Sequence, residues 1–163
     1  MNDDSESHDV PSAEEQIRAE RLAIRKRAMD MLARREHAPA ELAAKLRKRE
    51  HADADIEPVL DDLINEGLLS AERYAHAVVR SKSERGIGPL RIRRDLAAAG
   101  VSDSLIEIAL DEAEVDWFAL AEAVRHKRFG ALSPGDFPTR AKQMRFLQGR
   151  GFEPDQLRAA FDD

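Results

Sequence analysis

The stretch Arg80–Gly100, RSKSERGIGPLRIRRDLAAAG, contains the end of one helix, a turn and the start of another. Proline is tolerated in the first turn of a helix, where its missing N–H needs no partner, so Pro89 predicts a helix start. Gly86 and Gly88 allow the chain to reverse direction just before it. Six Arg or Lys residues stand against two acidic residues here. The stretch therefore fits either a solvent-exposed helix surface or a site for an anionic partner.

The composition is typical of a helical protein. Of the 163 residues, 36% are charged, 42% are hydrophobic and 5% are aromatic, which favours helices over strands. The absence of cysteine excludes a disulfide framework, a thiolate nucleophile and Cys-type zinc sites. Neither a run of 18 apolar residues nor a basic-then-apolar leader occurs, so a cytoplasmic location is expected.

The charges are segregated along the chain. Residues 1–15 contain six acidic residues and no Lys or Arg, and their lack of periodicity predicts a disordered acidic tail. Residues 18–49 contain 11 basic and four acidic residues, and residues 125–150 contain seven basic residues and one Asp. The net charge of −6 argues against a polyanion partner, whereas this distribution argues for one.

Helical spacing of apolar residues continues beyond the tail, starting with a helix from Ile24 to about Arg35. Polar residues mark several later helix starts. Ser70 and Ser102 are expected to cap helices, and Asp53 or Asp55 is expected to cap the helix that carries residues 56–64. A further helix is expected to begin at Asp116. Capping is thus a better interpretation of these serines than nucleophilic attack.

Two apolar positions recur at spacings of 50 and 51 residues. They are Leu46, Leu96 and Leu147 in one set, and Leu60, Leu110 and Phe161 in the other. Gln143 departs from the pattern, because it aligns with Leu42 and Ile92. We expect an all-α fold, an elongated array of three tandem three-helix repeats over residues 22–69, 70–115 and 116–163, preceded by the tail at 1–15.

No constellation typical of an enzyme occurs in the sequence. The five histidines are scattered and lack the spacing of a metal site. The Gly-Ile-Gly at 86–88 has neither the further glycine of a dinucleotide loop nor the Gly-Lys-Ser/Thr of a phosphate loop. We therefore expect no catalytic residue, no metal and no cofactor, and a protein that is not an enzyme.

Basic residues of the second and third repeats are the expected contacts for a partner. Cations that line one face would follow a phosphate backbone over several nucleotides, whereas the scarcity of aromatic residues argues against base stacking. The expected partner or DNA contacts are Arg80, Lys82, Arg85, Arg91, Arg93, Arg94, Arg125, Lys127, Arg128, Arg140 and Lys142. The expected structural turn is Gly86, Gly88 and Pro89.

This order of turn, proline and basic residues resembles the RecX family, bacterial regulators of the RecA recombinase. The matching segments are Glu66–Leu69, Glu72–Ala75, Arg80–Lys82, Gly86, Gly88–Pro89, Arg91–Ile92, Leu96, Gly100–Val101, Arg150–Phe152 and Leu157. The resemblance covers roughly residues 22–161 and leaves the acidic tail outside. It implies a non-enzymatic protein that lodges in the groove of the RecA filament on DNA and inhibits its ATPase, strand exchange and filament growth.

The residues themselves leave a second hypothesis open. Arg91, Arg93 and Arg94 stand at a helix start after a glycine turn, as in a direct DNA-binding protein built from helix-turn-helix-like units. Both hypotheses predict contact with single- or double-stranded DNA. Neither predicts a membrane or a small-molecule substrate as partner.

Overall fold

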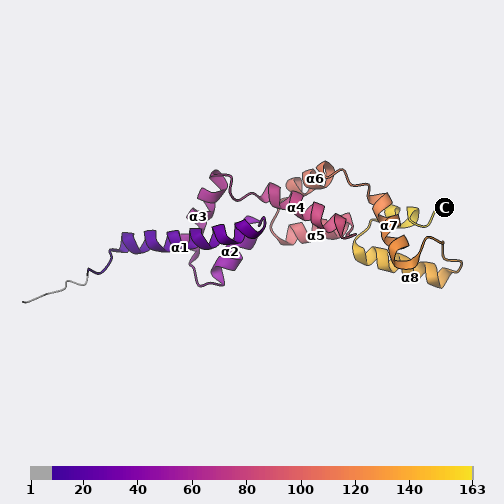
Figure 1. Cartoon of the computed structure of the whole chain (residues 1–163), viewed down its shortest axis with the longest axis horizontal. Coiled ribbons are helices and arrows are strands. Elements are labelled where there is room, and N and C mark those ends of the chain that lie inside the picture. The colour runs from indigo at the N-terminus through magenta and orange to yellow at the C-terminus, as the bar shows by residue number, and fades with distance from the viewer. Residues whose placement is uncertain (1–8, 163) are drawn as a thin grey trace, which may run out of the picture. The chain divides into compact units, whose positions relative to one another are not determined.

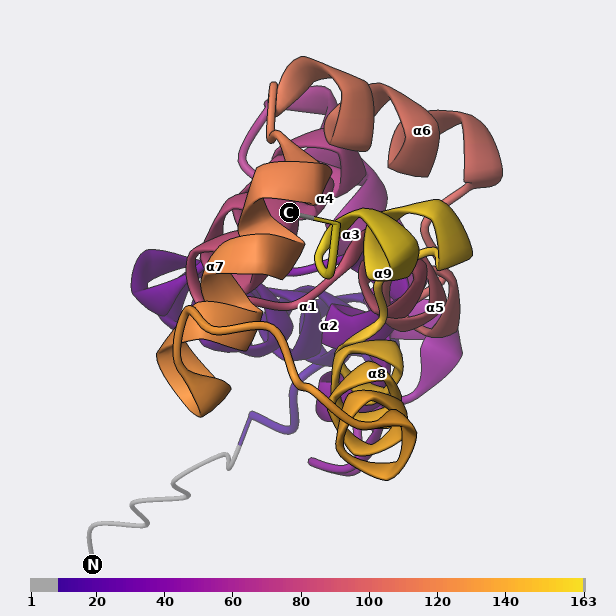
Figure 2. The ribbon, with the colours of Figure 1, turned by 90° about the vertical axis from the view of Figure 1, so that its right-hand side faces the viewer.

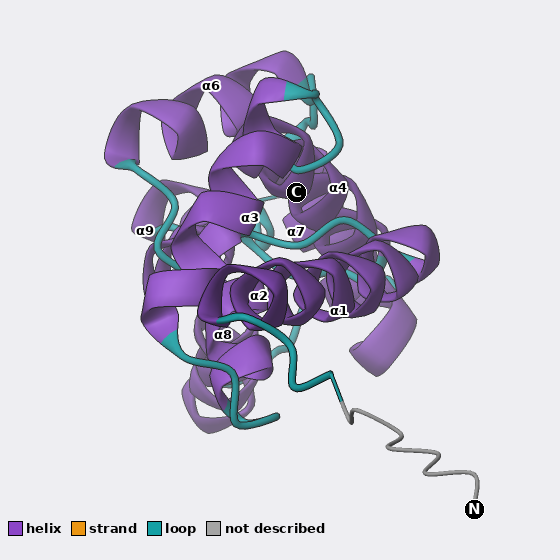
Figure 3. Ribbon diagram, turned by 90° about the vertical axis from the view of Figure 1, so that its left-hand side faces the viewer, coloured by secondary structure: helices purple, strands orange, loops and turns teal. Residues whose placement is uncertain are grey.

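The computed structural model describes residues 9–162, and these form nine helices and no strand (Figures 1 and 3). None of these helices is long and apolar enough to cross a membrane. The all-α prediction is confirmed. The helices are α1 (Ala13–Arg34), α2 (Pro39–Arg47), α3 (Asp53–Asn65), α4 (Ala71–Glu84), α5 (Pro89–Ala98), α6 (Asp103–Glu112), α7 (Trp117–Phe129), α8 (Phe137–Arg150) and α9 (Pro154–Ala159).

Helix α1 begins well before the expected start at Ile24. The hydroxyl of Ser12 accepts the N–H of Glu15 at 3.2 Å, and the carboxylate of Glu15 accepts the N–H of Ser12 at 2.8 Å. This reciprocal cap satisfies N–H groups at the helix start that have no partner within the helix. The prediction of a disordered tail is therefore wrong for residues 13–15, and its residues 1–8 lie outside the described part of the chain.

Side-chain caps set the start of several other helices. Ser70 and Ser102 each accept a backbone N–H three residues further on, as expected. Asp116, at which the sequence predicts a helix start, is the N-cap of α7 and accepts the N–H of Ala119 in the same way. The cap expected for α3 is wrong, because the N-cap residue is Ala52 and makes no side-chain hydrogen bond. Both candidate aspartates lie in the first turn instead, where their carboxylates still interact favourably with the helix dipole.

The described residues divide into two compact units. Unit 1 contains residues 9–35 and 42–69, and unit 2 contains residues 36–41 and 70–162. Three clusters of buried apolar side chains form the cores: one in unit 1 from α1–α3, and two in unit 2 from α4–α6 and from α7–α9. The three three-helix repeats are thus confirmed, each with a core of its own.

Burial follows the predicted repeat register. The six aligned apolar side chains are all 6% exposed or less: Leu46, Leu96, Leu147, Leu60, Leu110 and Phe161. Gln143, aligned with Leu42 and Ile92, is 6% exposed, and its side-chain oxygen has no hydrogen-bond partner among the described residues. The third repeat therefore buries a polar side chain at a position that is apolar in the other two repeats.

Two turns of unit 2 dock through their backbones. Gly88 donates its N–H to the Arg150 carbonyl at 2.8 Å, and Leu90 donates its N–H to the Gly151 carbonyl at 2.9 Å. A Cβ on Gly88 would lie 2.4 Å from the carbonyl carbon of Gly151, and a Cβ on Gly151 would lie 2.4 Å from the Cβ of Arg91. Both positions therefore require glycine. We call this contact, between residues 86–91 and 150–152, the turn junction.

A similar close approach occurs one repeat earlier. Gly100 aligns with Gly151 and also has a positive φ, 84°, and a Cβ there would lie 3.0 Å from the Cβ of Ala40 at the start of α2. Ala38, which aligns with Gly88, is 1% exposed and belongs to the cluster of α4–α6. These contacts explain why residues 36–41 belong to unit 2, a division that the repeat pattern did not predict.

Arg125 belongs to the core of the third repeat, whose helices α7, α8 and α9 face the viewer in Figure 2. Its side chain is 1% exposed, and its Nε donates to the carbonyl of Ala160 at 2.7 Å. The guanidinium also lies 5.0 Å from the ring centroid of Phe161. These contacts offset part of the cost of removing the charge from water. The prediction of Arg125 as a partner contact is therefore wrong, because its charge is not accessible.

The turn junction predicts that Gly151→Ala lowers the free energy of unfolding by about 2–4 kcal/mol. The new Cβ would overlap Arg91 and would hold a non-glycine residue at a φ of 94°. Gly149, in α8, has no such neighbour within 4 Å, so Gly149→Ala is the matched control and should raise stability by roughly 0.5–1 kcal/mol. Urea denaturation followed by circular dichroism compares the two, and equal effects would contradict the prediction.

The burial of Arg125 predicts that Arg125→Met lowers the free energy of unfolding by about 2–3 kcal/mol, because the Ala160 carbonyl loses a charged donor. Lys127 lies two residues further along α7 and is exposed, so Lys127→Met should change stability by less than about 0.5 kcal/mol. Thermal melts of both variants provide the comparison. A variant at Arg125 as stable as the one at Lys127 would show that this arginine is not a core residue.

Candidate functional site

Two hollows open at the turn junction of unit 2 and share Arg85 and Arg150. The smaller, of about 310 Å³, is lined by the end of α4 and the start of α5. The larger, of about 370 Å³, is lined by the end of α4, by residues 120–128 of α7 and by Phe146 and Arg150 of α8. Their cations form one surface, the basic junction, which consists of Lys82, Arg85, Arg91, Lys127, Arg128 and Arg150.

Two carboxylates offset part of the charge of the basic junction. Asp95 accepts a hydrogen bond from the ammonium group of Lys82, and Glu84 lines the larger hollow. None of the other five cations forms an ion pair with a residue in the described range 9–162. Their charges are therefore available to an anionic partner, and together they produce a positive potential at this surface.

Contacts within unit 2 hold three of these guanidinium groups in place. Arg85 donates to the carbonyl and hydroxyl oxygens of Ser81, both at 3.2 Å. Arg150 donates to the Arg85 carbonyl at 3.3 Å and lies 5.2 Å from the ring centroid of Phe146, and Arg128 lies 5.7 Å from the same centroid. Side chains that are already ordered lose less conformational entropy when a partner binds.

Arg93 has a structural role, unlike its neighbour Arg91. Its guanidinium donates to the carboxylate of Glu107 at 2.7 and 3.2 Å and to that of Glu153 at 2.8 Å, which ties α5 to α6 and to the start of α9. The hydrogen bond from Arg93 lowers the pKa of Glu107, and the same bond raises the pKa of Arg93. Two carboxylates thus neutralise Arg93, which makes it a weaker candidate for an external anion than the exposed Arg91.

The other expected contacts lie apart from the basic junction. Arg80, Arg94 and Lys142 are exposed but line neither of its hollows. Arg140 is half-buried, with its guanidinium 5.0 Å from the ring centroid of Phe161. Five of the eleven expected residues are therefore brought together, and they are Lys82, Arg85, Arg91, Lys127 and Arg128.

Sequence reasoning missed Arg150 and Phe146 as members of this site. The spacing along the chain does not reveal that the turn after α8 meets the turn before α5. The available sign was the alignment of Gly151 with Gly100, which marks two equivalent helix ends, each followed by an apolar residue. That alignment indicated a repeat but did not indicate which turn each glycine contacts.

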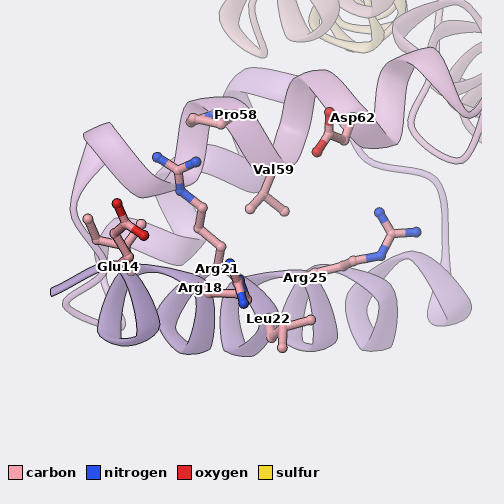
Figure 4. A pocket seen from close by; sticks show the side chains of 9 residues that line it. Glu14, Arg18, Arg21, Leu22, Arg25, Pro58, Val59 and Asp62 are labelled. Carbon is pink, nitrogen blue, oxygen red and sulfur yellow. The ribbon is translucent and has the colours of Figure 1, made fainter. Parts of the chain in front are cut away.

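Unit 1 has a groove of its own, of about 440 Å³, between α1 and α3 (Figure 4). Two of its arginines are already paired, Arg21 with Asp55 at 3.4 Å and Arg25 with Glu66 at 2.6 Å. Its charges are therefore largely balanced, and it is a weaker candidate than the basic junction for an anionic partner. Among the described residues, no three His, Asp or Glu side chains are grouped so that they could hold a metal ion.

All three repeats match models of one protein family. The first three-helix domain of RecX matches residues 25–63, the second matches residues 72–110 and the third matches residues 114–161. Together these matches cover most of the chain, including every helix of the basic junction.

Relatives and solved structures agree with the family models. A regulatory protein RecX of Halorhodospira halophila is 51% identical over 138 residues, which are 85% of this chain and 86% of the relative. One of Pseudomonas entomophila is 46% identical over 136 residues, 83% of this chain and 88% of the relative. The crystal structure of RecX from Lactobacillus salivarius has the same fold, with a TM-score of 0.71 at 20% identity over 88% of this chain and 95% of that one. The chain therefore belongs to the RecX family of regulatory proteins.

Proposed function

We propose that this chain is a non-enzymatic regulator that binds the RecA filament on DNA in the cytoplasm. It modulates, and mainly inhibits, ATP hydrolysis, strand exchange and filament growth in recombination and DNA repair. The observation that carries the proposal is the match of all three repeats to the three RecX domains, together with relatives named as regulatory proteins at up to 51% identity.

The basic junction supports a partner with an anionic surface. Arg85, Arg91, Lys127 and Arg128 are exposed and have no carboxylate partner among the described residues. A recombinase filament on DNA offers two kinds of anion, phosphate groups and acidic side chains. The oriented cations of the basic junction attract phosphate groups and acidic side chains alike. Such charge complementarity raises the rate at which the two proteins associate and fixes the register in which they bind.

The proposal predicts that the protein slows ATP hydrolysis by RecA on single-stranded DNA at stoichiometric or lower amounts. The double variant Arg85→Ala/Arg91→Ala removes two unpaired cations of the basic junction. It should require about tenfold more protein for half-maximal inhibition, which corresponds to roughly 1.4 kcal/mol of binding free energy. A coupled ATPase assay measures the effect.

The matched control is the double variant Arg145→Ala/Arg158→Ala, which removes two exposed arginines outside both hollows. It should inhibit like the unchanged protein. No effect of the unchanged protein on hydrolysis or on filament length would refute the proposed function, and equal inhibition by the two double variants would refute the role of the basic junction.

Direct DNA binding is the second candidate function, and a specific observation favours it. Arg91 and Arg94 are exposed near the start of α5, directly after the turn that follows α4. In helix-turn-helix proteins the second helix presents its N-terminal residues to DNA in this way. This function does not exclude the first, because one surface can contact both recombinase and DNA.

Direct binding predicts a linear fall of log affinity for duplex DNA with log salt concentration, at a slope of about −4 to −5 if five phosphates are neutralised. Arg85→Ala/Arg91→Ala should reduce the steepness of the slope by about 2, because two phosphate contacts are lost. Fluorescence anisotropy without recombinase measures both slopes. The absence of binding to duplex and single strands at low salt would exclude this function.

A further inference from the structure

The larger hollow of the basic junction combines an aliphatic wall with a cationic rim. One wall is aliphatic and comes from α7, with Leu120, Ala123 and Val124 in two consecutive turns. The rim is cationic and consists of Arg85, Lys127, Arg128 and Arg150. A ligand that matches the wall and the rim combines an apolar group with negative charge. A phosphodiester backbone by itself provides the charge but not the apolar group.

The one aromatic ring among the residues that line this hollow, Phe146, is already packed against other side chains. Arg128 and Arg150 lie 5.7 and 5.2 Å from the ring centroid of Phe146, and Phe129 packs edge-on against it, with centroids 5.3 Å apart and an interplanar angle of 88°. Proteins that bind single-stranded nucleic acid stack bases on accessible aromatic rings. A nucleobase therefore finds little free aromatic surface here, whereas an aliphatic side chain finds the wall formed by α7.

The same contacts prepare the rim for carboxylates. Guanidinium groups bind carboxylates through two parallel hydrogen bonds, and those of Arg128 and Arg150 are held over Phe146 before any partner arrives. Glu84 lines the hollow too and repels an anion, but it stands against four cations. The volume of about 370 Å³ is near the lower limit of ordinary ligand pockets, which suits one or two inserted side chains.

We propose that this hollow binds a short acidic peptide segment of a partner protein. An aliphatic side chain of the segment packs against Leu120, Ala123 and Val124, and flanking carboxylates bind the guanidinium groups of the rim. The inference rests on the proposed function and deepens it, because the recombinase is the partner expected to present such a segment.

The first test measures binding of synthetic peptides to the full chain. A fluorescein-labelled hexapeptide of sequence DELLED is compared by anisotropy with DESSED, which has the same charge but lacks the leucines, and with labelled (dT)6. We expect DELLED to bind at least tenfold more tightly than DESSED and more tightly than (dT)6. Equal affinities for the two peptides would overturn the proposal, since the aliphatic wall would then contribute nothing.

The second test fills the hollow without changing its charge. Ala123 is exposed and lines the hollow, whereas Ala119 is exposed one turn earlier on α7 and does not line it. Ala123→Trp should weaken DELLED binding at least tenfold, and the matched control Ala119→Trp should leave it within twofold. Circular dichroism melts verify that both variants are folded.

Two further outcomes would overturn the peptide site. One is unchanged DELLED affinity in Ala123→Trp, and the other is tighter binding of (dT)6 than of DELLED, which would identify the rim as a phosphate site. Neither measurement contains recombinase. Failure of the peptide site is therefore distinguishable from failure of the proposed function, which the ATPase assay with the unchanged protein decides alone.

Discussion

The backbone contact between Gly88 and the Arg150–Gly151 turn is the constraint on which unit 2 depends. Both glycines are buried, and the N–H of Gly88 has a carbonyl partner on the opposite turn. Separating the turns would leave polar backbone groups without partners, at roughly 1–3 kcal/mol for each group that stays buried. The contact holds the start of α5 against the end of α8. It thereby brings cations from α4, α5, α7 and α8 onto one surface.

Three arginines at the start of α5 show how a single helix assigns different roles to similar side chains. Successive residues of a helix are rotated by about 100° from one another. Arg91 consequently faces the turn junction, Arg93 reaches two carboxylates, and Arg94 lies beside a separate hollow with Asp103 and Glu107. The density of positive charge along the sequence identifies the start of α5 as a basic segment. Only the contacts of each side chain distinguish a cation that is available to a partner from one that is neutralised within the protein.

Much of the fold was predictable because it depends on local rules. The glycine-proline turn, the serine caps and the repeated leucines each follow from residue chemistry over a few positions. Even the missed start of α1 had a local sign, since Ser12 and Glu15 have the spacing of a capping box. The burial of Arg125 also had a sign, because it lies one turn after the buried Ala121.

The candidate site was less predictable, because it depends on contacts between distant segments. Arg150 is 65 residues away from the carbonyl of Arg85 that its guanidinium contacts. Spacing rules describe neighbours on one helix and do not describe which turns meet in space. The sequence thus predicted five members of the basic junction as basic residues of interest, and only the docking of two repeats shows that they act together.

Glu50 is the exception at a position that recurs in all three repeats. It aligns with Gly100 and Gly151 and has the same left-handed backbone, with a φ of 66°, yet it carries an exposed side chain. In the second and third repeats this position receives the start of the second helix of the repeat before it, and a Cβ would obstruct that contact. Glycine at this recurring position is therefore required by the helix start that packs against it, since Glu50 shows that the left-handed backbone alone tolerates a side chain.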